Sequence, residues 1–237
     1  MTPLVLIPGY MLDDALWDGM LPHLPPDLPL HFASMAHGDN IAAIAQHVLD
    51  GCPPRFSLLG FSMGGYVARA VQRLAPERVE MMALVATSSR ADQPLQVEQR
   101  AQAARAAPLG TFRGLGRAAI AQSLRPANAG NEELIAQVRA MGERLGREVF
   151  VRQSQIVRQA DTALLADIRC PVLVVAGAED QLRSLDEAQE LAQAIPCARL
   201  EVIPHTGHLI PLEQPQALAA LLKVGVSSVK WTRRTHL

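Results

Sequence analysis

One serine of this chain lies in a setting typical of a nucleophile. Ser62 is the third residue of Gly60–Gly65 (GFSMGG). The apolar run Phe56–Leu59 precedes this segment, and helix-like sequence begins at Tyr66. Glycines around a serine permit a tight strand-to-helix turn that exposes the hydroxyl, and the helix N-terminus points N–H groups at a reacting carbonyl. The segment predicts a nucleophilic serine, although a G-x-S-x-G match by itself also occurs in ordinary loops.

A nucleophilic serine needs a base, and the base needs a carboxylate that fixes its tautomer. We expect the carboxylate in the acidic turn after the apolar run Val172–Ala176, where Asp180 follows Gly177 by three residues. Asp180 is the predicted acid, because it lies far enough along the turn to reach inward at the strand end. Glu179 is the alternative, and either carboxylate could instead cap the helix expected nearby.

The base is expected after the next apolar run, Arg199–Ile203. Two histidines follow this run, His205 and His208. His208 comes directly after Gly207, and glycine permits the turn that would bring an imidazole back over the strand end. His208 is therefore the predicted base, and His205 is the alternative.

Attack of a serine on a substrate carbonyl also needs two N–H groups, which stabilise the negative charge that develops on the carbonyl oxygen. Met63 follows the nucleophile and supplies the first backbone donor. The second is expected in a neighbouring glycine turn, Pro8-Gly9-Tyr10-Met11, which ends the first apolar run. Tyr10 is the predicted donor, with Met11 as the alternative.

These residues must be positioned by a sheet. Short apolar runs alternate with helix-like sequence, which predicts an α/β fold with a mostly parallel sheet of about six strands and helices on both faces. The expected strands are Leu4–Ile7, Leu30–Ser34, Phe56–Gly60, Met81–Ala86, Val172–Ala176 and Arg199–Ile203. The expected helices include Ile41–Leu49, Gly64–Leu74, Leu185–Ala194 and Pro215–Leu222. In such sheets ligands bind at the carboxyl ends of the strands, where the residues above are placed.

The middle of the chain has no strand-like run. We expect residues 88–165 to form a helical cap insertion over the strand ends, with an amphipathic face between Leu134 and Leu145. Residues 1–87 and 166–224 then form the core, and 225–237 a C-terminal tail. The cap contains 11 arginines against 7 acidic residues. This excess favours either an anionic substrate or carrier, or simply a solvated helix surface.

Composition excludes several functional classes. The 237 residues are 49% hydrophobic and 19% charged, with a net charge of −1, so no nucleic acid or membrane partner is expected. The three cysteines are scattered, which argues against a disulfide framework or a zinc site, and no cofactor is expected. The N-terminal apolar run is short and lacks a basic leader, so a cytoplasmic location is expected.

Together these motifs make the chain resemble the α/β-hydrolase superfamily, in particular its small bacterial carboxylesterases with a helical cap. The resemblance covers nearly the whole chain. It rests on Pro8–Tyr10, Gly60–Gly65, Gly177–Asp180, Gly207-His208 and the following Pro211–Pro215. Two departures stand out. The family usually has two further strands before the first glycine turn, and it commonly has His-Gly where this chain has Pro8-Gly9.

The resemblance implies the same site that the motifs predict. It carries over Ser62 as the nucleophile, Asp180 as the acid and His208 as the base. Met63 and Tyr10 become the oxyanion donors.

The expected function is a serine carboxylesterase that cleaves small or medium acyl esters through an acyl-enzyme. A carbon–carbon hydrolase, enol-lactonase or lyase on the same scaffold is the alternative, because fold alone does not fix function. A further alternative is an idle ligand receptor.

Overall fold

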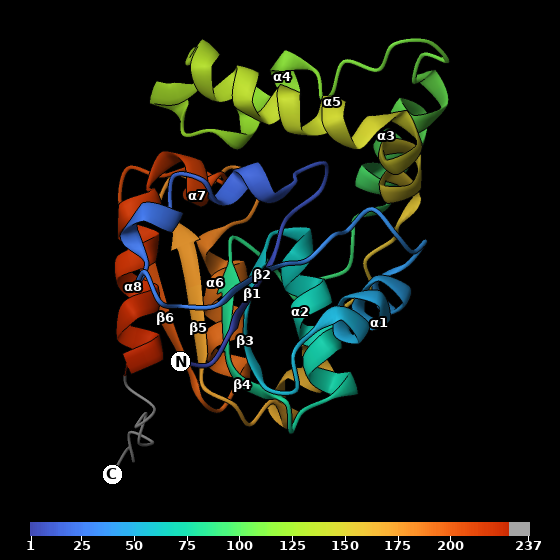
Figure 1. Ribbon diagram of the computed structural model, residues 1–237. Coiled ribbons are helices and arrows are strands. Elements are labelled where there is room, and N and C mark those ends of the chain that lie inside the picture. Colours follow the sequence, from blue (N-terminus) through green and yellow to red (C-terminus); the bar gives the residue numbers. More distant parts are fainter. Residues whose placement is uncertain (228–237) are drawn as a thin grey trace.

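Six parallel strands form one sheet in the order β2-β1-β3-β4-β5-β6. The computed structural model describes residues 1–227, with side chains described as far as Lys223. The strands are β1 (Leu4–Ile7), β2 (Leu30–Phe32), β3 (Phe56–Phe61), β4 (Val79–Val85), β5 (Val172–Gly177) and β6 (Ala198–Ile203). Figure 1 shows this sheet with helices on both sides and a helical segment above it. The predicted fold is confirmed.

The observed strand ends differ from the predicted ends by no more than two residues. β4 begins at Val79, two residues before the predicted start, because Val79 pairs with Phe56 of β3. β2 ends at Phe32, two residues early. β2 lies at the edge of the sheet beside β1. Residues after Phe32 therefore have a strand for hydrogen bonding on one side only.

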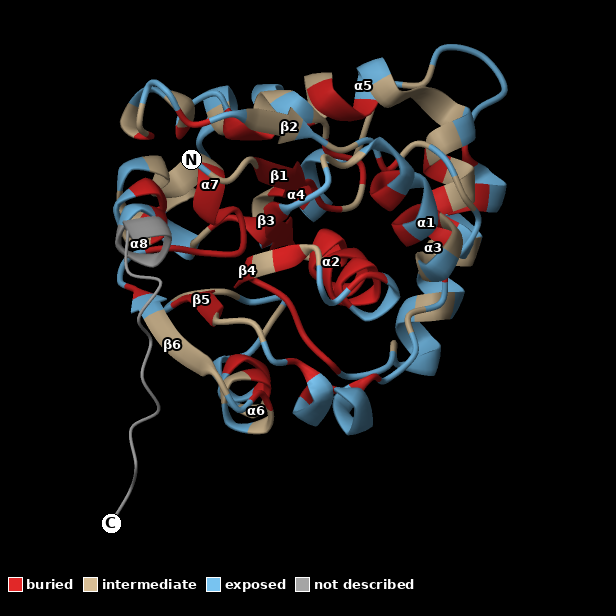
Figure 2. Cartoon of the chain, turned by 60° about the horizontal axis from the view of Figure 1, so that its bottom comes forward, coloured by how far each residue is buried: buried red, intermediate tan, exposed pale blue. Residues whose placement is uncertain are grey.

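Two separate cores lie on the two faces of the sheet, because successive side chains of a strand point to opposite faces. Leu4 and Leu6 of β1 pack in the core formed with η1, η2 and α8. Val5 and Ile7 pack in the core formed with α1, α2 and α6. These elements are η1 (Asp14–Trp17), η2 (Leu21–His23), α1 (Ile41–Gly51), α2 (Met63–Leu74), α6 (Leu185–Ala194) and α8 (Pro215–Ser227), with the short α7 (Ile210–Glu213) before α8. Figure 2 shows that burial is concentrated in central strands such as β1 and β3 and in α2, whereas the edge strand β6 is mostly intermediate.

The segment between β4 and β5 is helical and lies above the carboxyl ends of the strands (Figure 1). It contains α3 (Pro94–Ala106), α4 (Arg117–Ser123), η3 (Pro126–Asn128), α5 (Glu132–Gln155) and η4 (Thr162–Asp167). α5 buries Ile135, Val138 and Met141, three members of the predicted amphipathic face. Gly146 has a φ of 80° and produces a kink within α5. We call residues 88–165 the cap segment.

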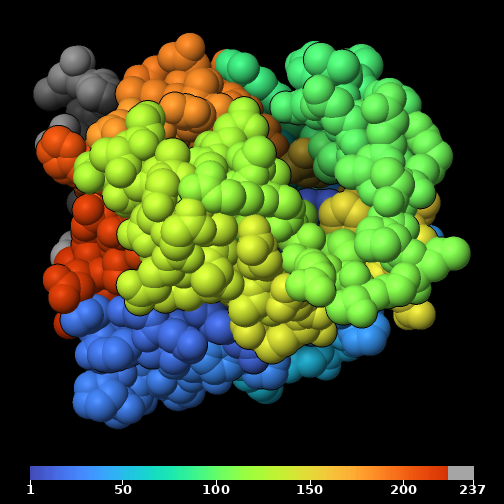
Figure 3. Space-filling model, turned by 90° about the horizontal axis from the view of Figure 1, so that it is seen from above, coloured from blue at the N-terminus to red at the C-terminus, as the bar shows by residue number. Residues whose placement is uncertain are grey.

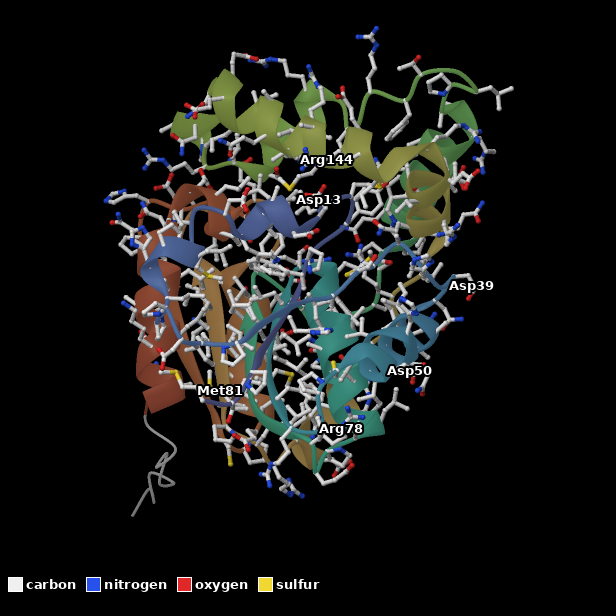
Figure 4. All side chains as sticks on the ribbon, viewed as in Figure 1. Asp13, Asp39, Asp50, Arg78, Met81 and Arg144 are labelled. Atoms are coloured by element: carbon white, nitrogen blue, oxygen red, sulfur yellow. The ribbon has the colours of Figure 1, made fainter. Side chains whose placement is uncertain are left out.

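An ion pair of α5 joins the outside of the cap segment to the sheet domain. Arg144 of α5 donates to both carboxylate oxygens of Asp13, at 2.8 and 2.9 Å, and Figure 4 shows the two labelled side chains facing each other. Asp13 also caps η1 by accepting from the backbone N–H of Ala15. The tail predicted for residues 225–237 lies outside the described residues from position 228 onward. Within residues 1–227, no helix is both long enough and apolar enough to span a bilayer.

A buried ion pair fastens the return of the cap segment to α2. The guanidinium of Arg69 is completely buried and donates to both oxygens of Asp161, at 2.8 and 3.0 Å, and to the carbonyl of Ser88. Arg73 donates to the same carboxylate at 3.0 Å. The two ends of the cap segment, near 88 and 161, are thereby held to one helix.

Asp161→Ala is expected to lower the free energy of unfolding by about 3 kcal/mol, because it leaves the buried Arg69 guanidinium without its counter-ion. Denaturant unfolding followed by circular dichroism measures this change. Glu98→Ala is the matched control, since Glu98 forms an exposed pair with Arg105 and its loss should not move the midpoint. Equal midpoints for the two variants would contradict this role of Asp161.

Candidate active site

Ser62 occupies a strained turn between β3 and α2. Its φ of 53° and ψ of −114° lie outside the regions that side chains prefer, and it is the residue that caps α2. Two hydrogen bonds fix this backbone: Ser62 N–H donates to Val85 O at 2.8 Å, and Thr87 Oγ1 donates to Ser62 O at 2.7 Å. The serine hydroxyl is thus presented at the carboxyl edge of the sheet.

Three glycines around Ser62 are required by close packing. A Cβ on Gly60 would lie 2.5 Å from the carbonyl oxygen of Gly64. A Cβ on Gly64 would lie 2.3 Å from Pro8 O, and one on Gly65 would lie 2.5 Å from Thr87 Oγ1. Real Cβ atoms are not found at such distances, so larger residues would force α2 away from β1 and β4.

The structure brings Ser62, His208 and Asp180 together in one hydrogen-bonded chain. His208 Nε2 lies 2.9 Å from Ser62 Oγ, and His208 Nδ1 lies 2.8 Å from Asp180 Oδ2. A carboxylate only accepts, so Nδ1 carries the proton and Nε2 accepts from the serine hydroxyl. His208 is only 6% exposed, and its ring packs 5.2 Å from that of Phe61.

Asp180 is held by its own turn. Its Oδ1 accepts from the backbone N–H groups of Leu182 and Arg183, at 2.8 and 3.0 Å, which leaves Oδ2 for His208. The alternative acid and base lie elsewhere. Glu179 and His205 face each other at the surface, 3.5 Å apart, and the His205 side chain is 76% exposed.

The turn after β1 lies directly against the serine. A Cβ on Gly9 would lie 3.3 Å from the Cβ of Ser62. Met11 N–H, the alternative oxyanion donor, donates to Gln153 Oε1 at 2.8 Å and is therefore already engaged. Met63 is the first residue of α2, so its N–H has no acceptor within the helix. Met63 and Tyr10 both line the cavity that contains Ser62.

Two residues of α5 that the sequence analysis missed support this turn. Gln153 is 2% exposed; it accepts from Met11 N–H and donates to Met35 O at 3.0 Å. The neighbouring Ser154 Oγ lies 2.6 Å from the hydroxyl of Tyr10. Burial raises the pKa of Tyr10 above its ordinary value, and the hydrogen bond between Tyr10 and Ser154 opposes this. The sequence gives no signal for this role, because polar residues flank the pair on both sides, Arg152 and Gln155.

Glu213 is a second residue that the sequence analysis did not assign to the site. Its Oε2 accepts from Gly207 N–H at 2.7 Å, next to His208. Its Oε1 accepts from Arg125 N–H and from the side-chain amide of Asn128, at 3.0 and 2.8 Å. The carbonyl of Ser123 accepts from His208 N–H at 2.9 Å. The histidine loop is therefore built against the cap segment.

A cavity of about 470 Å³ lies between the cap segment and the strand ends, with Ser62 and His208 in its lining. This volume suits a small organic ligand. About half of the lining residues are apolar, among them Phe61, Val138 and Phe150. Viewed from the cap side, the surface is hollowed between two parts of the cap, and dark blue atoms of the N-terminal segment are visible inside (Figure 3).

The described residues contain no group of three or more His, Cys, Asp or Glu side chains that could hold a metal ion. The three cysteines are free and half-buried. Burial raises the pKa of Cys52 and of Cys170 to about 11, so neither thiol is an activated nucleophile.

Comparison with known proteins adds relatives over the full length. A sequence model described as the alpha/beta hydrolase family matches residues 4–221. The pimeloyl-[acyl-carrier protein] methyl ester esterase of Aromatoleum aromaticum is 31% identical over 254 residues, which cover 93% of this chain and 96% of that protein. The protein of the same description from Nitrosomonas europaea is 27% identical over 242 residues, covering 90% and 91%.

A solved structure with the same fold is that of a thermophilic esterase from Thermogutta terrifontis. Its TM-score is 0.82 at 26% identity, over 97% of this chain and 90% of that one. These relatives are described as esterases, in agreement with the predicted carboxylic ester hydrolase.

Gly64→Ala is expected to lower the free energy of unfolding by about 1–3 kcal/mol or to prevent folding, because the added methyl would meet two backbone carbonyls of the β1 end. Thermal unfolding measures the change. Gly130→Ala serves as the control, since open space surrounds that position and its melting temperature should not fall. A Gly64→Ala protein as stable as the control would exclude the packing constraint.

Proposed function

The chain belongs to the alpha/beta hydrolase family, and on this premise we propose that it is a serine carboxylesterase acting on small or medium acyl esters. The observation that carries this proposal is the chain of hydrogen bonds from Ser62 Oγ through His208 to Asp180 in the cavity lining. The description of the relatives as methyl ester esterases supports ester cleavage over carbon–carbon cleavage or lyase chemistry.

The first half of the proposed reaction forms an acyl-enzyme. Ser62 Oγ attacks the ester carbonyl carbon while His208 Nε2 takes the hydroxyl proton. Asp180 holds the imidazole in the Nδ1–H tautomer and stabilises the imidazolium that forms. The alkoxide of the alcohol then leaves, and His208 returns the proton to it.

The second half releases the acid. A water molecule loses a proton to His208 Nε2 and attacks the acyl carbon, and the proton then returns to Ser62 Oγ as the ester bond to the serine breaks. In both halves we propose that the backbone N–H groups of Met63 and Tyr10 donate to the carbonyl oxygen and so stabilise the negative charge that develops on it. Gln153 and Ser154 act as positioning residues, because they hold the turn that carries Tyr10.

The proposal includes the division of the chain into a core, residues 1–87 and 166–224, and a cap insertion, 88–165. The cap supplies much of the cavity lining, for example Ala103, Ala119 and Val138, so it would select the substrate. The expected cytoplasmic location stays a prediction.

Ser62→Ala is expected to reduce kcat for a nitrophenyl acyl ester by roughly 10⁴-fold or more, because the nucleophile is lost. A fluorophosphonate, which reacts with activated serines, should add its mass to the wild-type protein and not to Ser62→Ala, as intact-protein mass spectrometry would show. His208→Ala should slow formation of the adduct. Ser34→Ala, an exposed serine outside the cavity, is the control and should behave as the wild type. Unchanged turnover in Ser62→Ala would refute the mechanism.

Gln153→Ala is expected to lower kcat roughly tenfold with little change in KM, because the turn bearing Tyr10 loses its fixed position and stabilises the transition state less well. Steady-state kinetics with the same ester measure both constants. Gln155→Ala, an exposed residue two positions further along α5, is the control. If Gln153→Ala raised KM alone, Gln153 would be a substrate contact and not a positioning residue.

A further inference from the structure

Among the described residues, the charged side chains that line the cavity beside His208 and Ser62 are all arginines. Arg100, Arg158 and Arg183 contribute to the lining, and no described Asp or Glu does. Arg100 and Arg158 come from the cap segment, and Arg183 comes from the turn that follows Asp180. A cavity lined elsewhere by apolar residues and by uncharged polar ones such as Gln96 and Gln122 therefore has a cationic wall.

Two of these arginines share one carboxylate. Arg100 Nη2 donates to Asp92 Oδ2 at 2.6 Å, and Arg158 pairs with Asp92 through its guanidinium and, at 2.9 Å, through its backbone N–H. The Asp92 side chain is 1% exposed and is therefore fully committed to these partners. A single carboxylate neutralises only one of the two positive charges.

The third arginine, Arg183, has a carboxylate partner of its own, so this pair adds no net charge. Arg183 Nη1 lies 3.2 Å from Glu187 Oε1, and the Glu187 carboxylate also accepts from the backbone N–H of Ser184. Three guanidinium groups thus pair with two carboxylates, those of Asp92 and Glu187, so one guanidinium has no carboxylate of its own. Asp180 adds a negative charge nearby, but its oxygens accept from His208 and from its own turn and not from an arginine.

The arginines of the wall lie close enough to affect the pKa of one another and of Tyr10. Burial lowers the pKa of Arg158, and the neighbouring charges of Arg183 and Arg100 lower it further, against the effect of Asp92. A guanidinium nevertheless stays protonated near neutral pH. The positive charges of Arg100 and Arg158 are also felt by the hydroxyl of Tyr10, which lies beside the Ser62 turn. The cationic wall and the reactive serine therefore belong to the same small cavity.

We propose that Arg158 and Arg183, supported by Arg100, form a subsite for a carboxylate that the substrate carries at a distance from its ester bond. A planar guanidinium matches a carboxylate with two parallel hydrogen bonds, and an anion there would offset the unbalanced charge. The apolar lining around Val138 and Phe150 suits the hydrocarbon between the two groups. This inference rests on the proposed esterase function and narrows its substrate class.

The carboxylate could belong to either side of the ester. On the acyl side, the substrate is a half-ester of a dicarboxylic acid. On the alcohol side, it is an acyl ester of a hydroxy acid. In both cases water cleaves the ester to an acid and an alcohol, and the remote carboxylate takes no part in the bond changes.

Kinetics with matched neutral and anionic esters test the subsite. Monomethyl and dimethyl esters of the same dicarboxylic acids, at increasing chain length, address the acyl side. Acetate esters of hydroxy acids and of the corresponding hydroxy amides address the alcohol side. We expect kcat/KM for the anionic member of one series to exceed that of its neutral partner by roughly tenfold, about the value of one charge-assisted hydrogen bond.

Two variants assign the preference to the arginines. Arg158→Gln and Arg183→Gln should each remove most of it while leaving kcat/KM for the neutral ester within a few-fold of the wild type. If Arg158→Gln fails to fold, Arg183→Gln still tests the subsite, because it leaves the ion pairs of Asp92 with Arg100 and Arg158 intact. Arg117→Gln is the control, since Arg117 is an exposed cap arginine outside the cavity lining.

Calorimetry with Ser62→Ala tests binding without turnover. The preferred anionic ester should bind to this variant, and Ser62→Ala combined with Arg183→Gln should bind it more weakly. Equal kcat/KM for anionic and neutral esters in both series, with ester hydrolysis intact, would overturn the subsite alone. Absence of fluorophosphonate labelling and of hydrolysis of every ester would overturn the esterase function, and the calorimetry would still decide whether the arginines bind a carboxylate.

Discussion

The close approach of α2 to the ends of β1, β3 and β4 is the constraint on which the site depends. Gly64 and Gly65 let the helix lie against the Pro8 carbonyl and against Thr87. The same approach forces Ser62 to a positive φ, and hydrogen bonds to Val85 and Thr87 hold it there. The strain is tolerated because these two hydrogen bonds and the close packing at the glycines fix the surrounding backbone. A serine hydroxyl is thereby presented at the sheet edge without a flexible loop.

The cap segment is part of the site as well as a cover for it. Gln153 and Ser154 hold the turn after β1, and the carbonyl of Ser123 accepts from the backbone of the histidine loop. Glu213 ties that loop to the cap from the other side. Apart from the hydrogen bond of Glu213 to Gly207, each of these contacts joins residues more than eighty positions apart in the sequence. The positions of the turn after β1 and of the histidine loop therefore both depend on how the cap packs.

Buried charge is used in two ways in this molecule. The Arg69–Asp161 pair lies away from the cavity lining and fastens the cap segment to α2. The Asp92 cluster lies at the cavity, where two arginines share one carboxylate. In the first case both Arg69 and Arg73 donate to the carboxylate, and Arg73 is half-exposed, so water screens the surplus charge. In the second case the surplus faces the substrate cavity.

The sequence by itself determined the sheet and the motifs at its edge. Apolar runs placed all six strands within two residues, because the period of buried strands is a local property of the chain. Glycine spacing likewise singled out Ser62 and His208, since tight turns are specified by neighbouring residues. Only the tertiary structure separated the paired alternatives in space. Asp180 is hydrogen-bonded to His208, whereas Glu179 faces His205 at the surface. The N–H of Met11 donates to Gln153. These choices, like the cationic wall, depend on side chains that distant segments bring together, and no local pattern encodes such contacts.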